Sequence, residues 1–382
     1  MKKFLLFLLI SSFLLPSICF GAAATMYVTV AGAGTKAGGD WDNAMGLAEW
    51  DTDFSGSVEA GDIYYVKQGT YTHTSAMTSG TGGSATAPIQ VIGVVTATTE
   101  TPPDSTRWAY GDDRPLLAAG GNTVYSTGSY WLWRNFRMTT TDTHAFRVYT
   151  NSIAINVYVN NSGSSGRRAF YIAADSPSLI LCEAENANGR AFELNSTRFP
   201  RAENCYAHDS TDGFLTLNTG GGLILDSISS SNTNGINLGT THNTIRGTTI
   251  YGNTVGILGG TSGNNTITNN IISENATGAS WGTEQASNVF DYNSWFNTAD
   301  VVNVTTGSNS VTGNPLMNNP ASGDFTLTTG SPALDSGMKM NVNMGTVGDY
   351  KKNIGVDQDD NESGGGGSSA EATLILNGVA IN

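Results

Sequence analysis

A small residue followed by a large apolar residue returns about every 22 positions through the middle of the chain. The small residues stand 24, 22, 22, 22, 21 and 22 positions apart, at Ala145, Ala169, Ala191, Gly213, Gly235, Gly256 and Gly278. The next position reads Phe146, Phe170, Phe192, Phe214, Ile236, Ile257 and Ala279. Repetition at a fixed period of this size is typical of a fold in which similar units stack on one another.

Two repeat architectures have a period near this value. A leucine-rich repeat needs the spacing L-x-x-L-x-L with Asn or Cys in a fixed slot, and the sequence does not contain it. A coil of short strands needs apolar side chains at alternate positions, which point inward and stack. The pattern therefore predicts an all-β fold, a single-stranded right-handed parallel β-helix from about residue 60 to 330. We expect the four phenylalanines of the repeat to form one interior stack.

A second column of mostly polar residues follows the same period. It reads Asn186, Asp209, Ser231, Asn253, Asn275 and Asn297. Asn and Asp tolerate left-handed backbone geometry, and their side chains bond nearby backbone groups. We expect this column to form turns that bond the equivalent turn of the next coil.

Both ends of such a stack would expose unpaired strands, and the sequence contains a candidate cap for each end. Near the front, Gly38–Trp50 has apolar residues at helical spacing and predicts a short amphipathic helix. Ala60–Thr72 follows as strand, turn and strand. At the back, residues 314–337 lead to a last short segment at 353–358.

These opening and closing segments resemble those of secreted bacterial right-handed parallel β-helix proteins of the pectin-lyase-like superfamily. The resemblance covers about residues 25–358, and its motifs indicate fold more than substrate. Residues 359–370 read as an acidic and Gly/Ser-rich flexible linker. Residues 371–382 read as an apolar strand, too short to fold alone. We expect that strand to pair with its own barrel; the alternatives are pairing with a neighbouring molecule, by self-association, and a disordered tail.

The first 24 residues have the pattern of a secretory signal peptide. Lys2 and Lys3 precede an apolar run, and small residues follow it. The run is shorter than the roughly 18 apolar residues of a membrane anchor, so we expect a secreted or cell-surface protein without membrane insertion. Cys19 raises the alternative of a lipoprotein, but Pro16–Ile18 in front of it lacks the usual small residue.

The charge balance excludes one class of partner. The chain has 18 Lys and Arg against 32 Asp and Glu, a net charge of −14, and nucleic-acid binding needs clustered cations. Cys182 and Cys205 remain after export, within the matching phrases Cys-Glu-Ala-Glu-Asn and Cys-Tyr-Ala-His-Asp. We therefore place them side by side on adjacent strands, either as a disulfide or as stacked small apolar residues.

The resemblance implies a polysaccharide ligand and suggests where chemistry would occur. Lyases of the superfamily use an Arg or Lys base and often Ca²⁺, and no lysine lies between Lys67 and Lys339. Calcium is accordingly the one cofactor that the resemblance suggests. The position before each small residue forms its own column, with adjacent coils roughly 4.8 Å apart; this column reads His144, Arg168, Arg190, Asp212 and Asn234.

From this column we predict a site. Its catalytic candidates are Asp212, Asp209, His208, Arg190 and Arg168, and its substrate-binding candidates are His144, Tyr171 and Glu193. Asp212 lies in the segment Ser-Thr-Asp-Gly, which resembles the N-T-D-G segment of polygalacturonase-type hydrolases. The other segments of that family, D-D, G-H-G and R-I-K, are missing from the later coils, which leaves Asp209 as the nearest second carboxylate. The alternative interpretation is a solvated ladder of ion pairs without catalysis.

Two further features remain open in the sequence. Aromatic clusters around Trp131 and Trp133, and around Trp281 and Trp295, either stack on sugar rings or fill the core. The run Asp357–Asn361 has alternating oxygen ligands but lacks the glycine and glutamate of an EF-hand loop. The sequence thus predicts an exported protein that binds and, as a lyase or glycoside hydrolase, cleaves a polysaccharide. The alternative is a non-catalytic surface, adhesion or structural module.

Overall fold

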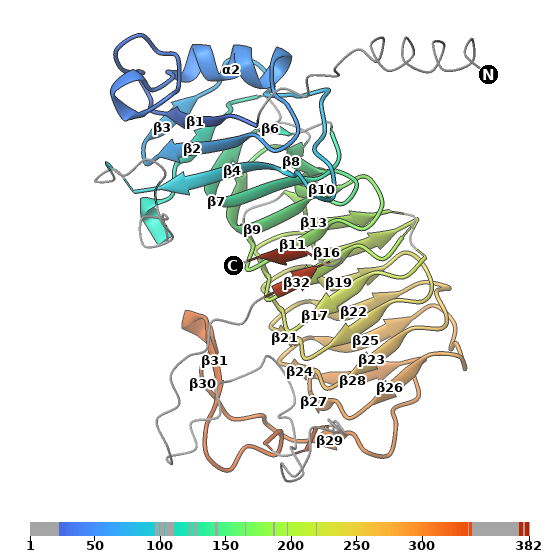
Figure 1. Cartoon of the computed structure of the whole chain (residues 1–382). Coiled ribbons are helices and arrows are strands. Elements are labelled where there is room, and N and C mark those ends of the chain that lie inside the picture. The colour runs from blue at the N-terminus through green and yellow to red at the C-terminus, as the bar shows by residue number, and fades with distance from the viewer. Residues whose placement is uncertain are drawn as a thin grey trace, which may run out of the picture.

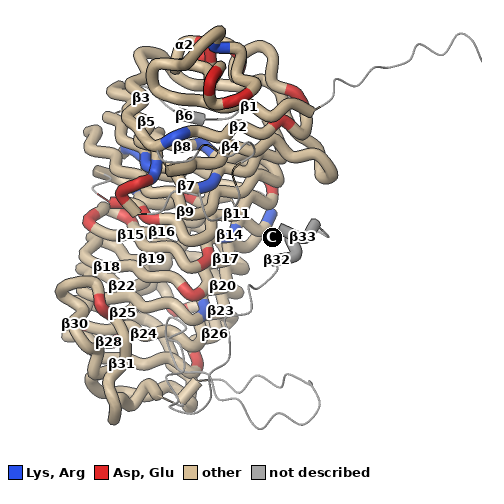
Figure 2. Tube along the Cα trace, turned by 60° about the vertical axis from the view of Figure 1, so that its left-hand side comes forward, with Lys and Arg blue, Asp and Glu red and all other residues tan. Residues whose placement is uncertain are grey.

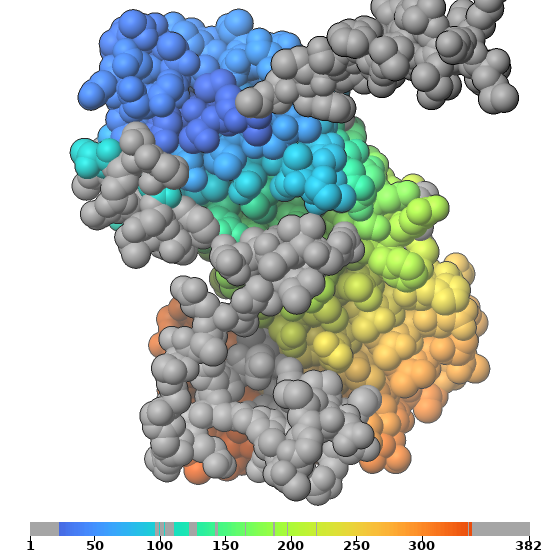
Figure 3. All heavy atoms as spheres, in the orientation of Figure 1, coloured from blue at the N-terminus to red at the C-terminus, as the bar shows by residue number. Residues whose placement is uncertain are grey.

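The computed structural model describes residues 23–95, 99, 103, 111–121, 124–125, 128–141, 144–164, 166–185, 188–196, 198–218, 220–334, 336–337, 374–376 and 379–381. The signal peptide, except its last two residues, the segment 353–358 and the linker 359–370 lie outside these residues. The described chain is a right-handed parallel β-helix, as the repeat predicts, and it descends coil by coil from α2 (Leu47–Gly56) (Figure 1). Coloured bands follow one another down the molecule because each coil packs on its neighbours (Figure 3).

One face of the solenoid is a nine-stranded parallel sheet. Its strands follow one another down the stack as β6 (Val124–Tyr125), β8 (His144–Val148), β10 (Arg167–Ile172), β13 (Gly189–Asn195), β16 (Asp212–Leu217), β19 (Asn234–Leu238), β22 (Val255–Gly259), β25 (Thr277–Trp281) and β28 (Ala299–Val302). The register follows the sequence repeat, since Phe170 pairs with Phe146 above and Phe192 below. Each strand therefore presents the same positions of the repeat to the interior and to solvent.

A twenty-stranded parallel sheet forms the rest of the wall. Its first strands are β1 (Thr25–Val28), β2 (Ile63–Lys67), β3 (Thr70–Thr72), β4 (Ile89–Val94), β5 (Leu116–Ala118), β7 (Trp131–Thr140) and β9 (Ile153–Asn161). Below β9 it divides into two columns. The β11 column comprises β11 (Ser178–Ile180), β14 (Arg201–Glu203), β17 (Leu223–Leu225), β20 (Thr244–Arg246), β23 (Thr266–Thr268) and β26 (Val289–Asp291). The β12 column comprises β12 (Glu183–Glu185), β15 (Tyr206–His208), β18 (Ile228–Ser230), β21 (Thr249–Tyr251), β24 (Ile271–Ser273), β27 (Ser294–Phe296) and β29 (Val311–Thr312).

The interior is a continuous apolar core in which the predicted phenylalanine stack is confirmed. Phe146, Phe170, Phe192 and Phe214 are fully buried, and their successive ring centroids lie 5.9, 4.9 and 4.9 Å apart. The last two ring pairs are nearly parallel, at 10° and 11°. Complete burial of one such side chain contributes about 1.5–3 kcal/mol, so the stack is a large part of what holds these coils together.

Asparagine side chains link successive coils. In one of these columns, part of the ladder lies one sequence position later than we predicted. The ladder contains Ser210 and Asn232 in place of Asp209 and Ser231. Ser210 N–H donates to Asn232 Oδ1 at 3.0 Å, and Asn232 N–H donates to Asn253 Oδ1 at 2.9 Å. Asn253 N–H donates to Asn275 Oδ1 in the same way, also at 2.9 Å. Asn186, the first residue of the predicted column, lies outside the described residues. The left-handed backbone lies one position earlier, at Ser231 and Glu274 among others. The amide side chain and the left-handed turn are therefore supplied by adjacent residues.

The small-residue column is explained by this ladder. A Cβ at Gly235 would lie 2.6 Å from the carbonyl oxygen of Gly256 and 2.9 Å from Nδ2 of Asn253. A Cβ at Gly213 would lie 2.5 Å from the carbonyl oxygen of Gly235. Glycine is required there because the backbone of the next coil and its asparagine come too close for any side chain.

The N-terminal cap is helical, although the predicted helix begins too early. The segment before Gly46 forms only a 3-10 turn (Trp41–Asn43), and α2 runs on to Gly56. The Glu49 side chain accepts a hydrogen bond from Gly46 N–H at 3.1 Å, which fixes the start of the helix. Trp50 and Phe54 are fully buried beneath it. No helix in the described parts of the chain is long and apolar enough to cross a membrane.

The C-terminal elements lie beside the stack. An antiparallel hairpin of β30 (Met317–Asn319) and β31 (Asp324–Leu327), joined by a 3-10 turn (Pro320–Ser322), stands next to the lower coils (Figure 1). Phe325 of this hairpin packs edge-on against Tyr206 and Tyr251. The apolar tail forms two short strands, β32 (Leu374–Leu376) and β33 (Val379–Ile381), which pair with each other where we predicted a single strand. A third 3-10 turn spans Gly111–Asp113.

Two open questions of the sequence are settled by burial. Trp131, Trp133, Trp281 and Trp295 are at most 2% exposed, so of the two alternatives these indoles fill the core. Cys182 and Cys205 are free thiols at 1% exposure each, stacked on adjacent coils without a disulfide. Burial, with Cys182 as neighbour, raises the pKa of the Cys205 thiol well above its ordinary value.

Candidate functional site

The predicted charged column exists as predicted on the nine-stranded sheet. Backbone pairing aligns Arg168 with His144 and with Arg190, on the strands to either side. Arg190 in turn aligns with Asp212, and Asp212 with Asn234. His144, Arg168, Arg190 and Asn234 are half-buried and Asp212 is 7% exposed, whereas the phenylalanines two positions further along four of these strands are fully buried in the core.

Glu193 organises this column from a buried position. Its carboxylate is fully buried and forms ion pairs with Arg168 Nε and with Arg190 Nη1, the latter at 2.5 Å. Arg168 Nη1 also lies 3.0 Å from His144 Nε2. Glu193 stands one outward position further along β13 than Arg190, which places it between the two guanidinium groups. Glu193 therefore orients both arginines, and its predicted contact with substrate stays a prediction.

Asp212 is held by neighbours on the next coil. Its Oδ1 accepts hydrogen bonds from Asn234 Nδ2 at 2.9 Å and from Asn237 Nδ2 at 3.0 Å. Its Oδ2 lies 3.9 Å from Arg190 Nε, and the residue is 7% exposed. The carboxylate is thus oriented within a polar network on the surface of the sheet.

Tyrosine rings and guanidinium groups alternate above this network. The Tyr171 ring lies 5.0 Å from the guanidinium carbon of Arg168 and 5.2 Å from that of Arg147. Arg147 also lies 5.2 Å from the ring of Tyr149. His144 packs on Tyr171 with centroids 4.7 Å apart. We name Arg147, Tyr149, Arg168, Tyr171 and Arg190 the arginine–tyrosine face.

His208 and Asp209 belong to a different network. His208 ends β15 in the β12 column, and the turn at Asp209 separates it from β16. Asp209 Oδ2 lies 2.8 Å from His208 Nδ1, so Asp209 is engaged with the imidazole. The carboxylate that shares Arg190 with Asp212 is Glu193, whereas the sequence suggested Asp209 as its companion. The predicted site residues therefore form two clusters on two faces.

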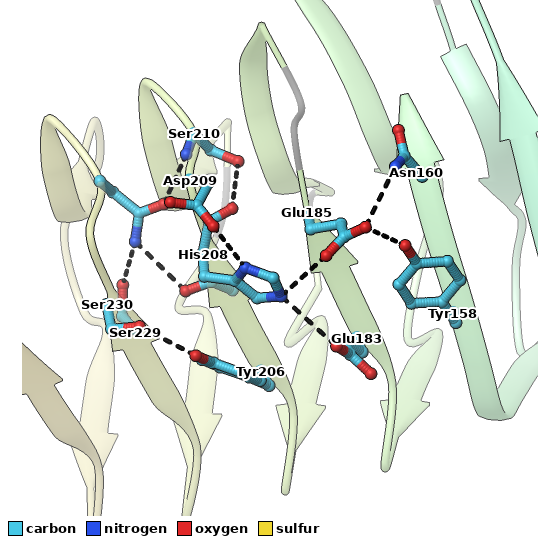
Figure 4. A network of polar contacts seen from close by, with 12 residues as sticks. Tyr158, Asn160, Glu183, Glu185, Tyr206, His208, Asp209, Ser210, Ser229 and Ser230 are labelled. Atoms are coloured by element: carbon cyan, nitrogen blue, oxygen red, sulfur yellow. Dashed lines mark hydrogen bonds and ion pairs between the residues drawn. The ribbon is translucent and has the colours of Figure 1, made fainter. Parts of the chain in front are cut away.

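Three side chains of types that can coordinate a metal ion converge in this second network, which Figure 4 shows from close by. His208 Nε2 lies 3.4 Å from Glu183 Oε1 and 3.8 Å from Glu185 Oε2, and the three donor atoms lie within 4.8 Å of one another. Tyr158 O–H and Asn160 Nδ2 both donate to Glu185 Oε1. Our sequence prediction did not include these glutamates as site residues. The matching phrases that begin at Cys182 and Cys205 were the available signal, because they align Glu185 with His208.

The two glutamates and Asp209 influence the acid–base properties of their neighbours. Burial alone lowers the pKa of His208, but the carboxylates of Glu183 and Asp209 outweigh burial and raise the pKa above its ordinary value. Burial, together with the hydrogen bond to Glu185, raises the pKa of Tyr158 to about 12. The imidazole is therefore surrounded by groups that favour positive charge at this position.

The comparisons with known proteins agree with the architecture. The family described as periplasmic copper-binding protein (NosD) matches residues 139–331, which is half of the chain. Among solved structures, a pectate lyase, Pel9A, matches with a TM-score of 0.58 and 16% identity over 88% of this chain and 97% of its own. A rhamnogalacturonan lyase matches with a TM-score of 0.55 and 15% identity over 75% of this chain and 87% of its own. No curated protein matches the sequence. At these identities the solved structures show the fold alone.

Proposed function

The chain belongs to the family described as periplasmic copper-binding protein (NosD), and we propose that it acts outside the cytoplasm, where it binds a polysaccharide through the arginine–tyrosine face. Export is supported by the family description and by the signal-peptide pattern of the first 24 residues. Fold alone does not imply a ligand. The proposed ligand class therefore rests on the side chains of the arginine–tyrosine face.

The observation that carries the proposal is the alternation of guanidinium groups and tyrosine rings on adjacent coils. Aromatic faces stack on sugar rings, and guanidinium groups bind carboxylates in a planar, bidentate manner. Arg168 and Arg190 are 21% and 29% exposed at the side chain, so one edge of each remains accessible to solvent. A ligand that satisfies both features is a polysaccharide whose sugars carry carboxylates. Two of the most similar solved structures bear the names of polysaccharide lyases, which is compatible with this ligand class.

The charge distribution supports the same surface. Four arginines, Arg147, Arg167, Arg168 and Arg190, lie on three adjacent strands of the nine-stranded sheet, which also carries the carboxylates Glu193 and Asp212, in a protein with a net charge of −14. Figure 2 shows the basic segments concentrated in the upper half of the solenoid. An acidic polysaccharide would be repelled by most of the molecule and attracted here, which directs it to one face.

Cleavage is the second candidate function, and Asp212 is the observation in its favour. It matches the Ser-Thr-Asp-Gly resemblance, is nearly buried and lies beside Arg190. Hydrolysis needs two carboxylates on opposite sides of the scissile bond, and Glu193 is enclosed by Arg168 and Arg190. Binding without turnover therefore fits the geometry better than catalysis.

The test is a panel of uronate-containing and neutral polysaccharides, with and without Ca²⁺. Affinity electrophoresis should show that uronate polysaccharides retard the exported chain, residues 25–382, and that neutral polysaccharides do not. The same panel is assayed for new reducing ends and for the absorbance of unsaturated products. Turnover that disappears in Asp212→Asn and persists in Asp209→Asn would assign catalysis to this face. Failure of every polysaccharide to retard the protein overturns the proposal.

A further inference from the structure

The β12 column brings nitrogen and oxygen donors to one point by backbone geometry alone. Glu183 and Glu185 are two positions apart on one strand, so both side chains project from the outer side of the sheet. His208 occupies the matching place on β15, the next strand, which pairs with β12 in parallel. Adjacent strands lie about 4.8 Å apart, and this spacing brings the imidazole to both carboxylates.

The surrounding residues orient the three side chains. Asp209 Oδ2 lies 2.8 Å from Nδ1 of His208, so a neutral imidazole donates its Nδ1 proton to Asp209 and directs the lone pair of Nε2 at the glutamates. On the other side, Tyr158 and Asn160 hold Glu185 by its Oε1, which leaves Oε2 toward His208. Tyr206 stacks on the imidazole with centroids 4.3 Å apart. A carboxylate behind the histidine is the usual support of a metal-binding imidazole.

The cluster of Glu183, Glu185 and His208 is rich in carboxylates and partly exposed to solvent. Glu183, Glu185 and Asp209 supply three carboxylates, and Arg114 is the nearby cation that interacts electrostatically with Glu183. His208 is 11% exposed at the side chain, whereas Glu183 is 39% exposed. The imidazole is thus largely covered, whereas the Glu183 carboxylate is in contact with solvent. An ion from solvent can therefore reach the three donor atoms without any rearrangement of the coils.

The family description names copper, and we propose where this chain would hold it: Glu183, Glu185 and His208 bind one divalent first-row transition-metal ion, with Cu(II) held most tightly. One nitrogen and two carboxylates suit Cu(II) or Zn(II), whereas Ca²⁺ prefers six to eight oxygen ligands. Affinities for such a donor set follow the order that peaks at Cu(II). Cu(I) prefers thiolate or thioether ligands, and the two described cysteines point into the core. This site is independent of the proposed polysaccharide face, because it lies on another sheet.

The experiment uses the exported chain without a histidine tag, freed of metal with a chelator. Calorimetric titration with Cu(II), Zn(II) or Ca²⁺ should give one equivalent of Cu(II), weaker Zn(II) binding and no saturable Ca²⁺ binding. The electron paramagnetic resonance spectrum of the Cu(II) protein should contain hyperfine coupling to one imidazole nitrogen. These readouts do not depend on any catalytic activity or on polysaccharide binding.

Matched substitutions locate the ion. His208→Asn should weaken Cu(II) binding at least tenfold and remove the nitrogen coupling, whereas His242→Asn, at an exposed histidine, should change neither. Asp209→Asn should weaken binding by about tenfold, as removal of a supporting carboxylate does. Equal melting temperatures of the metal-free variants show that the fold is intact. Cu(II) binding that is unchanged in His208→Asn, or lost equally in His242→Asn, would overturn the proposal, as would the absence of a saturable Cu(II) site.

Discussion

Glu193 is a fully buried carboxylate held between two partly exposed arginines. Burial of a single charge is costly unless it is paired and hydrogen-bonded. Arg168 and Arg190 provide the pairing, and Asn195 Nδ2 donates to the other carboxylate oxygen at 3.4 Å. The glutamate thereby fixes the direction of both guanidinium groups, on which the proposed ligand-binding face depends.

Replacement of this carboxylate by an amide tests that role. Glu193→Gln keeps the shape but leaves two guanidinium groups without their shared anion, so we expect the free energy of unfolding to fall by about 2 kcal/mol. Because both arginines remain partly hydrated, the loss should be smaller than for a fully buried pair. The control is Glu284→Gln, at an exposed glutamate, with an expected change within about 0.5 kcal/mol. Equal urea denaturation curves for the two variants would show that Glu193 has no such role.

At the scale of the elements, asparagine ladders set the corners of the coils. Asn275 is fully buried; its Oδ1 accepts from Asn253 N–H, and its Nδ2 donates to Asn297 Oδ1 and to the Ile250 carbonyl. A parallel ladder runs through Asn243 and Asn265 at another corner. Each asparagine satisfies backbone groups of two coils that the turn would leave unpaired in the interior.

The loss of one ladder residue should therefore be expensive. Asn275→Ala leaves a buried N–H and two further polar groups without partners, so we expect the free energy of unfolding to fall by about 3 kcal/mol. Thr254→Ala, an exposed neighbour of the same ladder, should change it by less than about 0.5 kcal/mol. Chemical denaturation of both variants measures the difference. A loss in Asn275→Ala no larger than in the threonine variant would contradict a structural role for the ladder.

The elements that the sequence predicts well are those repeated in every coil. The phenylalanine stack and the pairing of Arg190 with Asp212 follow from the period, because a parallel register places equivalent positions side by side. The prediction places the asparagine column one position too early at Ser231, because Ser231 and Asn232 both suit a turn. Only the structure shows that Ser231 has the left-handed backbone and that Asn232 supplies the hydrogen-bonding amide. The predicted cap helix begins too early because Trp41 has helical spacing with the residues that follow. The helix in the structure begins only after Gly46, whose N–H is bonded by the Glu49 side chain.

The site was predictable only in part for a related reason. Equivalent positions of different coils are related by the period, so the charged column was found. Contacts between non-equivalent positions of the repeat, such as Glu193 with Arg168, depend on side-chain length and on burial. The period of the sequence encodes neither of these. The grouping of His208 with Asp212 failed because the left-handed turn at Asp209 places them on different sheets.

At the scale of the whole molecule, the solenoid separates its two candidate sites. The arginine–tyrosine face lies on the nine-stranded sheet, and the glutamate–histidine cluster lies on the β12 column. The rest of the chain is acidic, with a net charge of −14. An anionic ligand should therefore bind only where arginines gather, and added salt should weaken that binding because exposed charges are screened.

The most direct test of the central claim is calorimetric titration of a uronate oligomer into the wild type, Arg168→Gln, Arg147→Gln and Arg246→Gln. Arg246 is an exposed arginine on the β11 column, away from the proposed face. We predict saturable binding by the wild type and Arg246→Gln, weakened about tenfold in each of the other two variants, since one hydrogen bond to a charged group contributes about 1.5 kcal/mol or more. Equal affinity in all four proteins, or no binding by the folded wild type, would contradict the proposed polysaccharide-binding face.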